Sequence, residues 1–145
     1  MPELSGLQLD HVGLSAGDLE ALAAWYRRAL GLAEEARFSY TIGRRQVKGV
    51  LLASPNGWRL ELQHCEGSET GQPASVLAAL LRQGLAHLCL RVEDIDAAFA
   101  LLVERGAGVS FPPTPSPLAG MRVSYLTDPE GNFIELLEQR DTLES

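Results

Sequence analysis

The feature that most constrains the fold of this chain is an internal repeat. The segments SPNGWRLELQ, from Ser54 to Gln63, and DPEGNFIELLE, from Asp128 to Glu138, share a proline-containing turn, a glycine and an apolar run. In each, a glutamate follows the proline by six positions. These glutamates, Glu61 and Glu135, are 74 residues apart. A phrase that occurs twice predicts two copies of one structural unit.

The repeat extends far beyond this phrase. HVGLSAGDLEALAAWYRRALG begins at His11, and HLCLRVEDIDAAFALLVERG begins at His87, 76 residues later. In each copy an aspartate follows the histidine by seven positions, and a stretch with apolar residues at helical spacing then leads to a glycine. The two glycines, Gly31 and Gly106, are 75 residues apart. Offsets that differ by so little indicate two copies of one module.

Each module is predicted to have the element order βαβββ, which makes the fold class α+β with two tandem modules. A short apolar run precedes each helix. Asp18 and Asp94 suit helix N-caps, and the two glycines suit left-handed helix ends. The further strands are expected at Glu34 to Ile42, Gln46 to Ala53 and Trp58 to His64 in the first copy, and at Gly108 to Phe111, Arg122 to Thr127 and Asn132 to Leu137 in the second.

The chain, residues 1–145, is predicted to form a single domain. Module one covers residues 7–65, a linker with a short helix covers 66–85, and module two covers 86–139. Pro73 and Gly84 bracket the linker helix. FPPTPSPLAG, from Phe111 to Gly120, is too rich in proline for a helix or a central strand. We expect it to be a loop, either a lid over a cavity or an inert surface loop.

Composition limits the possible partners. The formal charge of -7 argues against nucleic acid and anionic membranes, because both need a basic surface. No apolar run approaches the roughly 20 residues that span a bilayer, and MPELSGLQLD does not resemble a secretion signal. We therefore expect a cytoplasmic protein. Its cysteines, Cys65 and Cys89, form no metal-type pair of neighbouring thiols and are expected to be reduced.

Strand alternation predicts a polar cluster. If the larger apolar residues of the strands face the helices, the opposite face presents His11, Glu61, His87 and Glu135. Burying four such groups without compensation is costly. A divalent cation removes the cost, because imidazole nitrogens and carboxylate oxygens bind zinc, nickel, cobalt, iron and manganese. Each residue alone is more simply structural or exposed, but the repetition in both copies favours one shared metal site.

Five other residues lie near these positions. Arg59, Gln63 and Arg91 share the predicted cavity face and are candidates for orienting a polar or anionic substrate, the alternative being ordinary exposed polarity. His64 lies on the opposite face from Glu61 and is expected to be a surface residue. Cys89 shares the face of His87, where a small buried hydrophobe is favoured over a thiolate ligand.

The strand-borne His11 and His87, the DPEGNFIEL hairpin with Glu135 and its echo SPNGWRLEL with Glu61 resemble the vicinal oxygen chelate superfamily. This superfamily includes glyoxalase I, methylmalonyl-CoA epimerase, extradiol dioxygenases, fosfomycin-resistance thiol transferases and bleomycin-binding proteins. The resemblance covers Leu7 to Gln139. It implies that the two modules form a cupped mixed sheet around one divalent metal ion, commonly completed in a homodimer.

The metal-ligand patterns of the superfamily distinguish its branches. The His, Glu, His, Glu pattern of glyoxalase I matches His11, Glu61, His87 and Glu135. The epimerase pattern has glutamine in the second place. Thiol transferases and extradiol dioxygenases use two histidines and one glutamate, which His11, His87 and Glu135 also satisfy. Glu61 therefore favours the glyoxalase-like branch. The chain lacks the asparagine-containing segment that often follows the second ligand in glyoxalase I, so the resemblance does not extend to glutathione.

The implied activity is proton transfer next to a metal-chelated carbonyl, that is, lyase or isomerase chemistry on a small molecule with neighbouring oxygens. The resemblance assigns Glu135 as ligand and possible base, and Glu61 as ligand or second acid/base. Three alternatives stay open: a metal-dependent dioxygenase, a metal-dependent thiol transferase, and a protein that sequesters a drug or metabolite without metal.

Overall fold

The computed structural model describes residues 2 and 4–139, so the outermost parts of the predicted domain, residues 1, 3 and 140–145, lie outside the described residues. The chain divides into two compact units, Met1–Glu69 and Thr70–Ser145. Each unit contains one four-stranded mixed sheet and one long helix in the order βαβββ. The predicted α+β class and the two tandem modules are therefore confirmed.

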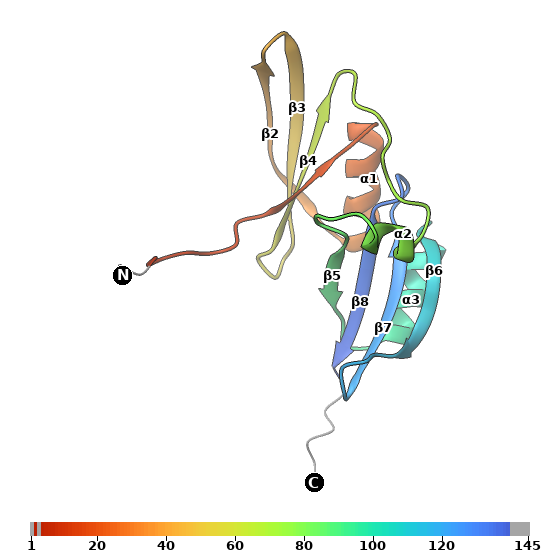
Figure 1. Cartoon of the computed structure of the whole chain (residues 1–145). Helices are drawn as coiled ribbons and strands as arrows, with labels where there is room; N and C mark the ends of the chain where they lie inside the picture. The colour runs from red at the N-terminus through yellow and green to blue at the C-terminus, as the bar shows by residue number, and fades with distance from the viewer. Residues whose placement is uncertain (1, 3, 140–145) are drawn as a thin grey trace. The chain divides into compact units, whose positions relative to one another are not determined.

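The sheet of the first unit has the strand order β1-β4-β3-β2. β1 is parallel to β4, and the other neighbours are antiparallel. Figure 1 shows β2 and β3 as a long hairpin and α1 beside the sheet, where it packs against β3 and β4. The elements are β1 (Val12–Ser15), α1 (Leu19–Leu30), β2 (Ala33–Ile42), β3 (Arg45–Ala53) and β4 (Arg59–Cys65).

Local sequence explains where α1 begins and ends. The Asp18 side chain accepts a hydrogen bond from the Ala21 backbone N–H at 3.0 Å, which satisfies one of the free donors of the first turn. Gly31 ends the helix with φ 70°, a left-handed conformation that glycine adopts without strain. Leu22 and Tyr26 are fully buried on the face that packs against the sheet.

The sheet of the second unit has the equivalent order β5-β8-β7-β6. β5 is parallel to β8, and α3 packs against β6, β7 and β8 (Figure 1). Four apolar residues of the strands that carry the glutamates, Leu60, Leu62, Ile134 and Leu136, are buried in their units. The elements are α2 (Val76–Leu80), β5 (Leu88–Arg91), α3 (Ile95–Glu104), β6 (Gly108–Pro115), β7 (Met121–Thr127) and β8 (Phe133–Gln139).

The duplicated phrase forms equivalent hairpin turns. In the first unit, the Ser54 hydroxyl accepts a hydrogen bond from the Asn56 backbone N–H at 3.2 Å. In the second, Asp128 Oδ1 accepts from the backbone N–H groups of Glu130 and Asn132, at 2.9 and 3.0 Å. Side chains of this kind stabilise a turn by bonding the backbone two residues on. The repeated sequence therefore specifies the entry into β4 and β8, the strands that carry the two glutamates.

The prediction of a loop from Phe111 to Gly120 is wrong for the first half of this segment, because β6 continues to Pro115. Prolines are tolerated here because β6 is the edge strand of its sheet, so a missing N–H on the outer side breaks no ladder bond. The pairing with β7 is irregular, with register shifts between Val109 and Phe111 and between Phe111 and Thr114. The segment is thus an irregular edge strand followed by a short turn.

Among the described residues, no helix is both long enough and apolar enough to cross a lipid bilayer.

Candidate functional site

The first unit brings His11 and Glu61 together. Glu61 lies on β4, opposite Gly13 of the parallel strand β1, and His11 lies directly before that strand. His11 Nε2 is 3.5 Å from Glu61 Oε2. A Cβ at position 13 would lie 3.8 Å from Glu61 Oε1, an ordinary van der Waals distance, so position 13 packs against the carboxylate. A histidine and a glutamate from adjacent strands therefore converge on one face of the sheet.

A second carboxylate orients the His11 imidazole. His11 Nδ1 is 2.7 Å from Asp10 Oδ2, and Asp10 Oδ1 is 3.0 Å from Arg59 Nη1. The hydrogen bond to Asp10, together with the charge of Glu61, raises the pKa of His11, and the same hydrogen bond lowers the pKa of Asp10. An Nδ1–H that donates to a carboxylate leaves Nε2 as the nitrogen that can bind a metal ion.

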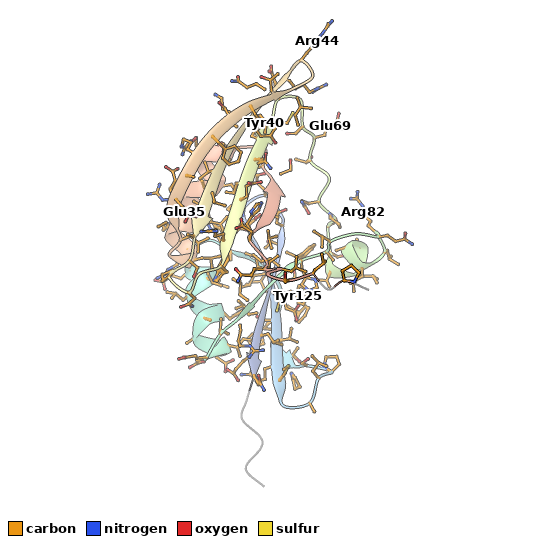
Figure 2. The ribbon with its side chains drawn as sticks, turned by 90° about the vertical axis from the view of Figure 1, so that its left-hand side faces the viewer. Glu35, Tyr40, Arg44, Glu69, Arg82 and Tyr125 are labelled. Carbon is orange, nitrogen blue, oxygen red and sulfur yellow. The ribbon has the colours of Figure 1, made fainter. Side chains whose placement is uncertain are left out.

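The second oxygen of Glu61 also has a partner. Gln63, two residues further along β4, donates from Nε2 to Glu61 Oε1 at 2.6 Å. Gln63 Oε1 in turn accepts a hydrogen bond from the hydroxyl of Tyr40 on β2. Figure 2 labels Tyr40 on the sheet of the first unit. The Glu61 carboxylate is thus held by an amide that is itself held by a phenol.

The second unit brings His87 and Glu135 together at the equivalent place. His87 Nε2 is 2.8 Å from Glu135 Oε2, and Glu135 lies on β8 opposite Cys89 of the parallel strand β5. The side chains of Glu61 and Glu135 are each only 17% exposed, whereas those of His11 and His87 are about one-third exposed. Each pair is therefore shielded from bulk water on the carboxylate side and accessible on the imidazole side.

Sequence reasoning missed Tyr125, which contacts both members of the second pair. Its hydroxyl donates to Glu135 Oε2 at 3.1 Å, and its ring meets the His87 ring edge to face with 5.3 Å between centroids. Desolvation and the charge of Glu135 raise the pKa of Tyr125, so it remains a hydroxyl donor. Counting register outward from the hairpin turn would have found it, because Tyr125 and Glu135 are cross-strand partners.

The residues predicted to orient substrate have three different environments. Gln63 contacts Glu61, as described above. Arg59 is ion-paired with Asp10 and, through Nε at 2.8 Å, with Glu35. Arg91 is exposed at the end of β5. Gln63 thus contacts the first His–Glu pair directly, Arg59 contacts it through Asp10, and Arg91 is an exposed residue of β5.

Two minor expectations are wrong. His64 is partly buried, and its Nδ1 lies 2.8 Å from the Ala16 carbonyl oxygen, where the imidazole ties β4 to the chain that follows β1. Cys89 is exposed as a residue rather than buried. Desolvation of its thiol and the nearby Glu135 raise the pKa of Cys89 to about 11, so the thiol is protonated at neutral pH.

A cavity of about 370 Å³ lies beside the first pair on the same face of the sheet. Its lining carries no charged side chain and mixes aliphatic groups with a phenol, a hydroxyl, an amide and a thiol. It includes Ser15, Tyr40, Ile42, Val47, Gln63 and Cys65.

The donor chemistry of both pairs fits a divalent metal ion. Imidazole nitrogen and carboxylate oxygen are ligands for zinc, iron, nickel, cobalt and manganese. The Asp10 contact to His11 is the arrangement by which proteins present Nε2 of a histidine to a metal. Among the described residues, neither unit by itself contains three or more His, Cys, Asp or Glu side chains that are grouped so as to hold a metal ion. Each unit contains one such pair of an imidazole and a carboxylate.

Comparison with known proteins is consistent with this geometry. The sequence profile of the Glyoxalase/Bleomycin resistance protein/Dioxygenase superfamily matches residues 8–136, which is most of the chain. The chain therefore belongs to this superfamily, and the resemblance inferred from the repeated histidines and glutamates is confirmed.

Two curated relatives have named activities. An ethylmalonyl-CoA/methylmalonyl-CoA epimerase of Cereibacter sphaeroides is 38% identical over 103 residues, which are 70% of this chain and 73% of the relative. A lactoylglutathione lyase of Schizosaccharomyces pombe is 26% identical over 153 residues, which cover 97% of this chain and 50% of the relative.

Solved structures share the fold. A glyoxalase family protein from Bacillus cereus matches with a TM-score of 0.78 and 23% identity over 97% of this chain and 99% of that one. Glyoxalase I from Zea mays matches with a TM-score of 0.69 and 18% identity, over 93% of this chain and 46% of the maize chain.

Proposed function

We propose that this protein is a divalent-metal-dependent enzyme that transfers a proton at a carbon next to a carbonyl group, as an isomerase or a lyase. The observation that carries the proposal is the His–Glu pair present at equivalent places in both modules. Membership of the superfamily supports it, because relatives of this chain include an epimerase and a lyase.

The proposed metal ligands are His11, Glu61, His87 and Glu135. One pair supplies two protein ligands, which is fewer than the three or four that catalytic metal sites use, so both pairs would share one ion. The two pairs come from one chain or from two copies in a homodimer. A bound divalent cation would polarise the substrate carbonyl and stabilise the negative charge that develops when the neighbouring proton leaves.

The proposed base is Glu135. Its Oε2 already lies in a hydrogen-bonded group with His87 and the Tyr125 hydroxyl, so a proton taken from carbon onto the carboxylate stays within reach of donors and acceptors. In a glyoxalase-type reaction, Glu135 would take the proton and return it to the adjacent carbon. In an epimerase, Glu135 would take the proton from one face of the carbon, and an acid on the opposite face would supply the replacement proton. A positioned base of this kind typically contributes on the order of 10² to 10⁴ in rate.

The substrate would be a small molecule with two neighbouring oxygens. The identity to an ethylmalonyl-CoA/methylmalonyl-CoA epimerase favours epimerisation of a carboxylated acyl thioester within this class. Glu61 argues against assigning the epimerase activity to this chain from sequence identity alone, because the epimerase pattern has glutamine in this position. A matched pair of substrates, a methylmalonyl thioester and a hemithioacetal, would distinguish the two branches.

Glu135→Gln tests the proposed base. In deuterium oxide, the wild-type protein loaded with metal is expected to exchange the substrate proton for deuterium. Glu135→Gln is expected to remain folded and to exchange this proton at least a hundredfold more slowly. The control is Glu104→Gln, which changes an exposed glutamate at the end of α3. Mass spectrometry of the substrate measures exchange.

Undiminished exchange in Glu135→Gln would contradict the role of Glu135. Oxygen uptake with catechols, or consumption of a thiol with an epoxide, in place of proton exchange would favour the dioxygenase or the thiol transferase. Tight binding of a ligand that chelators do not affect would favour a binding protein.

A further inference from the structure

We infer that Gln63 and Tyr40 are positioning residues that hold Glu61 as a fixed metal ligand, which separates its role from that of the base Glu135. The inference rests on the proposed function for the identity of the bound group, a divalent metal ion. The hydrogen bonds that carry it are features of the first unit alone.

The two hydrogen bonds fix the direction of the Gln63 amide. A glutamine side chain has one acceptor oxygen and one NH₂ donor, and their order depends on its partners. Tyr40 donates its hydroxyl to Gln63 Oε1, so the NH₂ group faces Glu61 and donates to Oε1 at 2.6 Å. Without Tyr40, the Glu61 carboxylate alone would orient the amide, and the Gln63 oxygen would lose the donor that fixes it.

A glycine on the middle strand shapes this contact across three strands. Tyr40 lies on β2 and Gln63 on β4, and the residue of β3 opposite Gln63 is Gly49. The Phe38 ring covers Gly49 so closely that a Cβ there would lie 2.1 Å from a ring carbon. Phe38 stacks on Tyr40 with 6.2 Å between ring centroids and 15° between planes. Gly49 and Phe38 thus hold the Tyr40 ring where its hydroxyl reaches Gln63.

The relay leaves one Glu61 oxygen for the metal. Because Oε1 accepts from Gln63, the carboxylate is restrained about its last torsion, and Oε2 is the oxygen presented 3.5 Å from His11 Nε2. His11 is restrained in the same way by Asp10. Both ligands of the first pair are therefore oriented by side chains that do not themselves belong to the pair, as is usual for metal ligands in proteins.

The second module has no equivalent relay. The residue 74 positions after Gln63 is Leu137, which has no polar group to offer Glu135. Glu135 receives instead the Tyr125 hydroxyl on Oε2, the same oxygen that contacts His87. The contacts of Glu135 thus gather on Oε2, whereas Glu61 accepts from an amide on Oε1 and faces its histidine with Oε2. We assign the fixed-ligand role to the glutamate with the amide donor and the role of base to the glutamate without it.

The test compares three variants with a control. Tyr40→Phe removes one hydroxyl and keeps the ring that stacks on Phe38, and Gln63→Leu introduces the residue of the second module. The third variant combines both changes. Thr41→Val, on the other face of β2, is the control. We expect Tyr40→Phe and Gln63→Leu each to weaken binding of Co²⁺ or Zn²⁺ by roughly tenfold, measured by competition with a chromophoric chelator.

The double variant tests whether the two residues act in series. Because Tyr40 acts only through Gln63, the double variant is expected to bind metal as weakly as Gln63→Leu and no weaker. Additive losses, or full affinity in Tyr40→Phe, would overturn the relay.

A second readout needs no metal. In ¹H–¹⁵N spectra of the metal-free protein, the side-chain amide signals of Gln63 are expected to shift in Tyr40→Phe and in Glu61→Gln, and to stay unchanged in Thr41→Val. Unshifted signals in both variants would overturn the relay while leaving the proposed function intact. The opposite outcome is also informative. If the Gln63 signals shift in both variants but the wild-type protein binds no metal, the proposed function and the ligand role of Glu61 are contradicted.

Discussion

At the scale of single residues, the two histidines differ in what supports them. His11 is oriented by Asp10, whereas the residue before His87 is Ala86. His87 is instead packed against the Tyr125 ring. One module therefore holds its histidine by a charged hydrogen bond, and the other holds it by an aromatic contact.

Asp10→Ala tests the charged hydrogen bond, since it gives the first module the residue that the second module has. We expect the affinity for Zn²⁺ to fall by about tenfold, because the imidazole loses the partner that fixes its tautomer and orientation. Asp10→Asn, which keeps an acceptor without the charge, is expected to lose less. Equal affinity in the wild type and Asp10→Ala would show that Asp10 does not support a metal ligand.

At the scale of elements, the strands that carry the glutamates also anchor the helices. Glu138 on β8 is buried, and its Oε2 accepts a hydrogen bond from the Ile95 backbone N–H, at the first residue of α3, at 2.8 Å. A carboxylate at a helix N-terminus satisfies a free donor and interacts favourably with the helix dipole. The residue 74 positions earlier is His64, which bonds the Ala16 carbonyl. Equivalent positions thus tie each strand to the segment that leads into or begins the helix.

Glu138→Ala is expected to lower the free energy of unfolding by about 2 kcal/mol, because it leaves the Ile95 N–H without its charged acceptor. Glu138→Gln keeps an acceptor oxygen and is expected to lose about half as much. Urea denaturation followed by circular dichroism measures both. A loss below about 0.5 kcal/mol in Glu138→Ala, the size typical of a surface substitution, would contradict this role.

At the scale of the whole molecule, the duplication explains most of what the sequence alone predicted. Near-constant offsets predicted two glutamates on equivalent strands and two histidines at equivalent places, which the structure has directly before β1 and β5. Strand alternation predicted that each histidine and glutamate share a face, and each pair is in contact. The helix limits followed from Asp18 and Gly31, because caps act locally.

The remaining features depend on contacts between strands, which periodicity does not specify. Tyr125 contacts Glu135 because of hairpin register, and Tyr40 reaches Gln63 while its ring stacks on Phe38, whose own ring lies over Gly49. The strand through Pro115 depends on its place at the sheet edge, where a missing N–H breaks no ladder bond. Sequence alternation gives the face of each side chain, whereas its partners depend on the neighbouring strands.

The central claim is that one pair from each module holds a single shared metal ion, and metal content measured by elemental analysis tests it most directly. The account predicts one divalent ion per chain in the wild-type protein, whether the pairs come from one chain or from two copies. It predicts that His11→Ala and His87→Ala each abolish binding, as does the double variant, while circular dichroism shows that all three stay folded. Two ions per chain, or full metal content in the double variant, would contradict it.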